Sequence, residues 1–288
     1  MEQQLHTGDI LIFQAEDKWI SKLIAWGTFS DVSHAAMVMA NGQMVEMGLD
    51  GIMLNLIGSN GGDPAYQLRL DPPQDTAPLA AAAARYLDQR ICYDIPALIL
   101  LGIALIFRHL HPSGPVYSLL DQLITAACVE LDKLINKILG HPDAMVCSQL
   151  VYQIYQDCGT LYHLQVRNGA LQAKDSADTI CLADCAASLR MEDYSAAKLP
   201  QNSVSDIEKL SRELMLALYD AEDIKEYMAP PQQLVVQTKT LLTQLEKLAK
   251  LTDQPLESLL VMPSDLVYHT DNLCRVNTVS VKRLERLR

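Results

Sequence analysis

The sequence predicts an α+β protein in which an antiparallel sheet packs on a helix that carries a cysteine. Three observations favour this class. Short apolar runs separated by turn residues fill the first 70 residues, where Asn41-Gly42 is a strong hairpin signal. From Thr76 onward, apolar residues recur mostly at helical spacing. Hydrophobic residues make up 49% of the 288, so the chain can bury a sizeable core and a mainly disordered chain is excluded.

The expected strands all lie in the first part of the chain. A helix over 17–26, with apolar residues at helical spacing, separates the first two strands. A glycine-rich loop at 58–64 separates the last two. The strands are expected at 8–13, 33–39, 43–47, 51–56 and 66–70.

The register of the Asn-Gly hairpin decides where Glu46 lies. With a two-residue turn, Glu46 would lie on the opposite side of the sheet from His34, because strand side chains alternate. With a three-residue loop over 40–42, Glu46 faces Ala36, on the same side as His34 and one diagonal step away. Gly42 suits the left-handed last position of the longer loop. The sequence therefore predicts the three-residue loop, with the Glu46 carboxylate within hydrogen-bonding reach of the His34 ring.

The rest of the chain is expected to be mostly helical, and its length suggests about two domains. Residues 1–190 are expected to form the main α+β domain, with a helical insert at about 100–140. Residues 191–262 would form a helical subdomain, and 263–288 would return to the core and end in a basic tail. The expected helices are 77–89, 95–108, 117–139, 144–157, 206–220 and 232–250.

Charge and cysteine content restrict the partners and the compartment. The 23 Lys+Arg and 35 Asp+Glu residues give a net charge of −12, which argues against a nucleic-acid binder. The basic segment 281–288 is interpreted as a solvated tail. Residues 1–6 do not resemble a signal peptide, and the cysteines, 7 in number, lack motif-like spacing. A cytoplasmic location with free thiols is expected, with specialised secretion left open.

The longest apolar run, 95–107, is too short to cross a membrane. A span needs about 20 apolar residues. The run is therefore expected to be a buried or groove-lining helix, and contact with a membrane surface is left open. No metal is expected either, because Cys181 and Cys185 lack a second pair at ligand spacing. Asp9 is expected to satisfy backbone donors in a turn.

One pair of residues suggests chemistry. His34 opens an expected strand, and Cys147 lies in the first turn of the helix 144–157. Taken singly, each favours a structural role, since Cys147 lies in register with apolar residues of its helix. Taken together, they predict a reactive thiolate, because a helix N-terminus and a nearby imidazole both lower a thiol pKa. Glu46 is the nearest candidate to orient the imidazole.

Several short segments carry a family resemblance. They are Gly8-Asp-Ile-Leu-Ile-Phe13, Ser33-His-Ala-Ala-Met-Val38, the Asn-Gly turn with Val45-Glu46, Cys92-Tyr93-Asp94, Cys147-Ser-Gln-Leu-Val-Tyr152 and Pro263-Ser-Asp-Leu266. These residues resemble the NlpC/P60 papain-like hydrolases. In ordinary members the cysteine helix precedes the strands, whereas here it follows them. The chain is thus similar to the circularly permuted branch, which includes YiiX-like and lecithin–retinol acyltransferase-like proteins.

The resemblance covers roughly residues 6–70, 85–98, 144–160 and 260–273, and it implies a thiol enzyme on a circularly permuted papain-like fold, without a cofactor. By resemblance, Cys147 is the nucleophile, His34 the general base and Glu46 the residue that orients it. The backbone N–H of Cys147 would donate to the oxyanion. Tyr93 would line the substrate site, and the alternative is a core tyrosine at a helix start.

Three functions remain open at this point. The first is an amidase or peptidase that cleaves a peptide, isopeptide or cell-wall-like amide bond through an acyl-enzyme. The second is a lipid-directed thioesterase or acyltransferase, suggested by the apolar segment 95–107. The third is a non-catalytic binding module or secreted effector on the same fold. The substrate would be a small peptide- or acyl-type molecule, and the sequence identifies no protein partner for the helical subdomain.

Overall fold

The computed structural model describes residues 5–18, 21–22, 24–25, 28, 30–48, 51–89, 91–93, 114–138, 144–167, 209–210, 213–214, 216–217, 232–251 and 261–284. By its contacts the chain divides into two compact units. The first unit comprises Met1–Asp94, Pro142–Ala173 and Glu257–Arg288, and the second comprises Ile95–His141 and Lys174–Leu256. The expected division into a domain at 1–190, a helical subdomain at 191–262 and a return segment at 263–288 stays a prediction.

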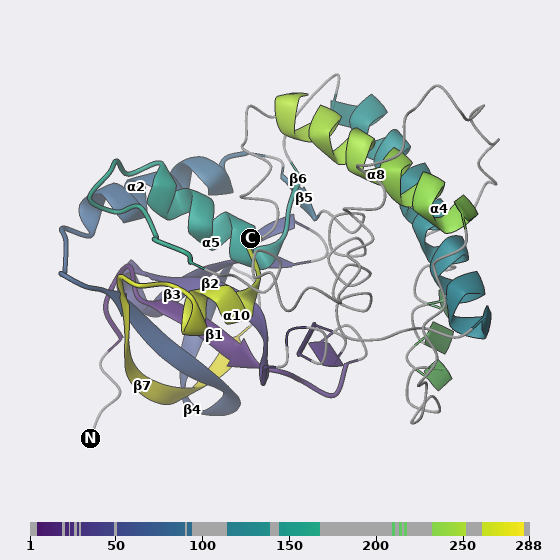
Figure 1. Cartoon of the computed structure of the whole chain (residues 1–288). Helices are drawn as coiled ribbons and strands as arrows, with labels where there is room; N and C mark the ends of the chain where they lie inside the picture. The colour runs from purple at the N-terminus through teal and green to yellow at the C-terminus, as the bar shows by residue number, and fades with distance from the viewer. Residues whose placement is uncertain are drawn as a thin grey trace. The chain divides into compact units, whose positions relative to one another are not determined.

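The first unit is built on one five-stranded antiparallel sheet (Figure 1). Its strands are β1 (Ile10–Gln14), β2 (Val32–Met39), β3 (Gln43–Gly48), β4 (Gly51–Leu70) and β7 (Leu273–Leu284), in the order β1-β2-β3-β4-β7. Strand β4 pairs with β3 through its first half and with β1 through its second half. The sheet therefore closes on itself, with β7 paired along β4. This confirms the α+β class with an antiparallel sheet.

Strand β4 differs from the prediction of two strands around a loop at 58–64. It runs as one strand of 20 residues, and its pairing with β7 shifts between Gly58 and Asp63. At Gly62 the backbone has φ +123°, and a Cβ would lie 2.2 Å from the carbonyl oxygen of Val281. The glycines thus allow close approach to β7 rather than ending the strand.

The hairpin between β2 and β3 has the predicted three-residue loop. Residues 40–42 form a short 3-10 turn, η1 (Ala40–Gly42), with positive φ at Asn41 and at Gly42. Met39 pairs with Gln43, and Ala36 pairs with Glu46. The register prediction is therefore confirmed.

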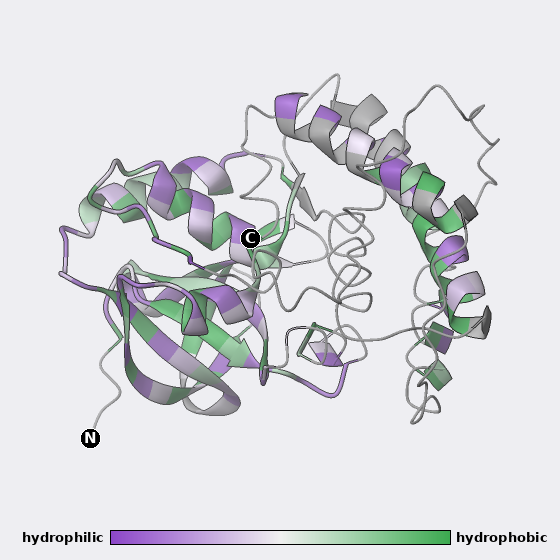
Figure 2. Cartoon of the chain, in the orientation of Figure 1, coloured by the Kyte–Doolittle hydropathy of each residue, from purple (hydrophilic) through white to green (hydrophobic). Residues whose placement is uncertain are grey.

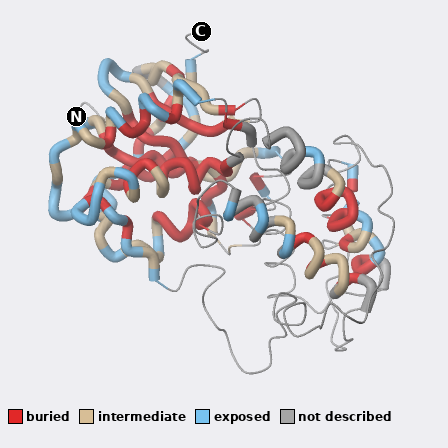
Figure 3. The backbone as a smooth tube through the Cα atoms, turned by 90° about the horizontal axis from the view of Figure 1, so that it is seen from above, coloured by how far each residue is buried: buried red, intermediate tan, exposed pale blue. Residues whose placement is uncertain are grey.

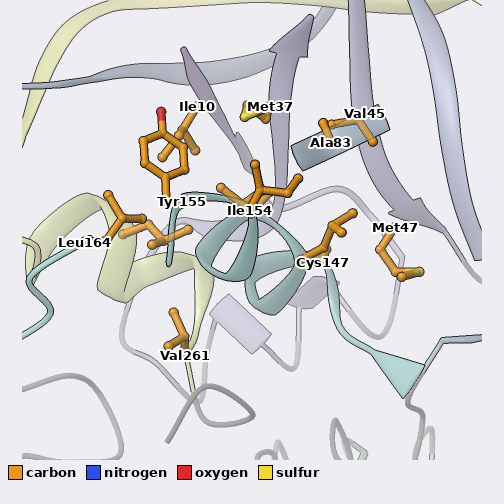
Figure 4. Close-up of a cluster of buried hydrophobic side chains, with 14 of the residues drawn as sticks. Ile10, Met37, Val45, Met47, Ala83, Cys147, Ile154, Tyr155, Leu164 and Val261 are labelled. Carbon is orange, nitrogen blue, oxygen red and sulfur yellow. The ribbon is translucent and has the colours of Figure 1, made fainter. Parts of the chain in front are cut away.

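The two faces of the sheet bury different cores. One face packs on the helices α2 (Ala77–Leu87) and α5 (Cys147–Gln156), as the labelled side chains of Figure 4 show. The other face forms a smaller core closed by β7, with residues Leu11, Phe13, Ala36, Val38, Met44, Ala65, Val279 and Val281. Strands β1 and β2 are almost entirely hydrophobic (Figure 2), and β1, β2, β3 and α5 are mostly buried, whereas β7 is mostly exposed (Figure 3).

Helix α5 begins later than its expected start at 144. Ala144–Met145 form the short strand β6, which pairs in parallel with β5 (Cys92–Tyr93). The helix proper starts at Cys147 and ends at Gln156, and Gly159 with φ +96° follows. Strand β6 thus lies just before α5, and Cys147 is the first residue of that helix.

The C-terminal segment is more ordered than a solvated tail. Helix α10 (Pro263–Tyr268) leads into β7, where Val279 and Val281 are buried. The side chain of Arg283 is only 25% exposed and is ion-paired. The interpretation of 281–288 as a solvated tail is therefore wrong for 281–284, because these residues pair with β4.

In the second unit, helices α4 (Gly114–Ile138) and α8 (Gln232–Leu251) pack against each other. The expected helix 95–108 lies outside the described residues, and 206–220 is described only in part. In the part of the chain that is described, no helix is long and apolar enough to cross a membrane.

Candidate active site

Cys147 occupies the first position of α5. The preceding Val146 is extended, and the Oε1 atom of Gln149 accepts its backbone N–H at 3.3 Å, which caps the helix start. Cys147 is 3% exposed and lies among core side chains (Figure 4). The first backbone N–H groups of a helix have no acceptor within the helix, so they point at a negative group placed there.

His34 lies on β2 and contacts the Glu46 carboxylate on β3. The Nε2 atom of His34 is 2.6 Å from Oε2 of Glu46. The imidazole packs against the Phe13 ring, with centroids 5.8 Å apart, and 20% of its side chain is exposed. The predicted reach from Glu46 to His34 is therefore confirmed.

Glu46 is 2% exposed, and both of its oxygens have partners. The Nδ2 atom of Asn55, on β4, donates to Oε1. The Nη1 atom of Arg283 lies 3.8 Å from Oε2, the oxygen that also contacts His34. A buried carboxylate needs such partners because burial without them is costly.

Sequence reasoning missed both Asn55 and Arg283. Asn55 is the one polar side chain in the apolar run 52–57, which was an available signal. Nothing local marks Arg283, because its partners lie on strands far away in the sequence.

Cys147 meets His34 at the end of the β2–β3 ladder. By alternation, His34 and Glu46 lie on the face of the smaller core, whereas Cys147 belongs to the core on the helix face. The recorded pairing of β2 with β3 ends at Ala36–Glu46. One residue further is Ala35, whose backbone, like that of Ser148, lies close enough to Cys147 to lower the pKa of its thiol, as His34 does more strongly.

The three ionisable groups shift one another toward their charged forms. Burial raises the pKa of the Cys147 thiol, but the charge of His34 and hydrogen bonds from His34, Ala35 and Ser148 hold it below its ordinary value. Burial lowers the pKa of His34, yet the charge of Cys147, with hydrogen bonds to Cys147 and Glu46, raises it to about 10. The electrostatics therefore favour a thiolate beside an imidazolium.

Glu46 is held in its ionised form within this group. Burial raises the pKa of Glu46, and the hydrogen bond and charge of His34, followed by Asn55 and Arg283, lower it below the ordinary value. An anion at this position retains the proton on the imidazole and fixes the ring orientation. The array can thus present a charged nucleophile together with a proton donor.

The sequence singled out other residues besides those of the Cys147–His34–Glu46 array. Asp9 accepts the backbone N–H of His6 at 2.8 Å, as expected, and also pairs with Arg69 at 2.6 Å. The backbone of Tyr93 pairs with Met145, two residues before Cys147, and its side chain lies outside the described residues. Cys181 and Cys185 also lie outside them. Within the described residues, no group of three or more His, Cys, Asp or Glu side chains could hold a metal.

Comparison of the chain with models of known protein families, with curated proteins and with solved structures found no match.

Proposed function

We propose that this protein is a cysteine-dependent hydrolase on a circularly permuted papain-like fold, which cleaves an amide bond of a peptide, isopeptide or cell-wall-like substrate. One observation carries the proposal: a first-turn helix thiol, an imidazole and a buried carboxylate form one hydrogen-bonded array. An array that only filled the core would not need three mutually ionised groups, because burial of charge is costly.

The chemistry follows from the protonation states. The Cys147 thiolate attacks the carbonyl carbon of the substrate, and the oxyanion accepts the backbone N–H of Cys147. The C–N bond then breaks, and the imidazolium of His34 gives its proton to the leaving amine. The neutral imidazole next takes a proton from water, whose oxygen attacks the acyl carbon and releases the acid and the thiolate. Glu46 stays ionised throughout and holds the ring.

The fold supports a permuted papain-like arrangement. The cysteine begins a helix packed on an antiparallel sheet, and the histidine lies on a strand of that sheet. In chain order the strand with His34 comes first and the helix with Cys147 second. The resemblance proposed from the sequence has the same order.

A lipid-directed thioesterase or acyltransferase would use the same array with another acyl donor or acceptor. The apolar segment 95–107, which suggested this function, lies outside the described residues. A non-catalytic module would retain the array without turnover. The experiment below separates all three functions.

The test is intact mass spectrometry after incubation with peptidoglycan fragments, phospholipids and acyl-thioesters. We expect an acyl adduct on Cys147 from a peptidoglycan fragment, and Cys147→Ala should abolish it. The matched control is Cys158→Ala, which removes a partly buried thiol outside the array and should leave the adduct. An adduct only from lipids or acyl-thioesters would support the lipid-directed function, and no adduct with intact folding would support the non-catalytic one.

A further inference from the structure

Arg283 brings a second positive charge to Glu46 from the other end of the chain. It lies on β7, and its Nη1 atom is 3.8 Å from Oε2 of Glu46. That oxygen also contacts Nε2 of His34 at 2.6 Å. The buried carboxylate thus lies between an imidazole and a guanidinium, and only the imidazole reaches Cys147.

The guanidinium is held in place from several sides. Its Nη2 and Nε atoms contact Oδ2 of Asp63, on β4, at 2.7 and 3.2 Å, and Nη2 also pairs with Glu16 after β1. Its Cζ atom lies 5.0 Å from the centroid of the Phe13 ring, a cation–π distance. Phe13 in turn packs on the His34 ring. The position of Arg283 is therefore set by three strands and by an aromatic ring shared with the site.

Arg283 supplies one of the few positive charges that face this group of acidic residues. Four groups are negative when the site is ionised, namely Glu16, Glu46, Asp63 and Cys147. The positive groups facing them are His34, Arg283 and Lys18, which pairs with Glu16 at 2.7 Å and is 70% exposed. Among the described groups that face this cluster, removing Arg283 would leave as cations only the partly exposed His34 and the exposed Lys18.

We propose that Arg283 is a positioning residue of the Cys147 site, which stabilises the ionised Glu46–His34 pair and through it the thiolate. The inference rests on the proposed function and extends it: the last strand, β7, supplies charge to the site as well as backbone pairing to β4. Arg283 touches none of the reacting atoms, so it acts through Glu46.

The test measures the rate at which iodoacetamide alkylates Cys147 as a function of pH, in the full chain. Removing a nearby cation makes a neighbouring proton harder to lose, so Arg283→Gln should move the midpoint of thiolate formation up by about one pH unit, a tenfold change in thiolate fraction below the midpoint. Arg283→Lys retains the charge, so its midpoint should stay close to that of the wild type. The matched control is Arg275→Gln, which removes an arginine of β7 that lies over Tyr66 instead.

A purely structural role would predict another pattern. Loss of folding would expose all thiols together, which the labelling of Cys128 and Cys158 reports. If Arg283→Gln does not fold, Asp63→Asn serves instead, because it removes a counter-anion of Arg283 and should move the midpoint to lower pH. An unmoved midpoint in folded Arg283→Gln, or an equal shift in Arg283→Lys, would overturn the inference.

The two proposals fail in different ways. If wild-type Cys147 titrates like an ordinary thiol, the proposed function itself is contradicted. If the wild-type midpoint is low and folded Arg283→Gln has the same midpoint, the proposed function stands and the role of Arg283 is wrong.

Discussion

The Glu46 carboxylate reaches His34 diagonally across the β2–β3 ladder, with 2.6 Å between Oε2 and Nε2. Glu46 is paired with Ala36, so the two side chains share a face only because the hairpin loop has three residues. A loop shorter by one residue would point the carboxylate away from the imidazole. The site thus depends on the local conformation at Asn41 and Gly42.

Replacing His34 should slow the reaction of Cys147 with iodoacetamide. Without the imidazolium, burial raises the pKa of the thiol toward or above an ordinary value near 8.5, so at about pH 6 the alkylation rate should fall by roughly 10²-fold in His34→Ala. The measurement is peptide mapping after timed labelling.

Cys158 is the internal reference thiol in that experiment. Its pKa is raised, chiefly by burial, so it should label slowly in both proteins. Equal labelling of Cys147 and Cys158, unaffected by His34→Ala, would contradict a reactive thiolate.

Glu46→Gln should lower the pKa of His34. The charge of Cys147 and the hydrogen bond and charge of Glu46 raise this pKa to about 10, against the effect of burial. Removing the anion takes away part of that rise, so the imidazolium should lose its proton at lower pH. The alkaline limb of the pH–activity profile should move down with it, and the rate should fall about tenfold or more.

Proton NMR of the His34 ring measures this pKa directly. Glu16→Gln is the matched control, because it removes a carboxylate that contacts Arg283 rather than His34. A His34 pKa that stays the same in Glu46→Gln would show that Glu46 does not act on the ring.

The local parts of the site were open to prediction, whereas its long-range parts were not. The turn residues Asn41 and Gly42 determine the register of adjacent strands, so the relation between His34 and Glu46 followed from the sequence. The contact of Arg283 with Asp63 spans 220 residues of sequence, and no local pattern reports it. The continuous strand β4 was missed for the same reason, since glycines that signal a loop there permit close pairing with β7.

Asn55→Ala should destabilise the folded protein and weaken the site. Asn55 is 8% exposed and donates to Oε1 of Glu46, so the change leaves a buried carboxylate oxygen without that donor. The expected loss in the free energy of unfolding is about 1–3 kcal/mol, measured by urea denaturation. Because Asn55 helps to lower the pKa of Glu46, the difference in stability between wild type and variant should shrink on acidification, within the range where Glu46 takes up a proton.

A surface asparagine provides the comparison for Asn55. Asn277→Ala on the exposed part of β7 should change the free energy of unfolding by no more than about 0.5 kcal/mol. If the two substitutions lower the free energy of unfolding equally, the contact between Asn55 and Glu46 contributes no more to stability than a surface side chain does.

Deletion of the whole second unit should leave Cys147 reactive. Deletion of 201–255 alone, which removes α8 but leaves α4, should destabilise the protein more. Leu120 and Ile124 of α4 are buried, as are Leu234 and Leu241 of α8, and the two helices pack together. Deleting 201–255 alone would expose the apolar face of α4, which costs about 1.5–3 kcal/mol for each large side chain.

Deleting both Ile95–His141 and Lys174–Leu256, with short glycine–serine linkers, removes both apolar faces and none of the residues of the array. We expect the doubly deleted chain to be folded by circular dichroism and to label at Cys147 at the wild-type rate, with its Cys147→Ala variant as the control. Loss of folding in the double deletion would show that the first unit depends on the second.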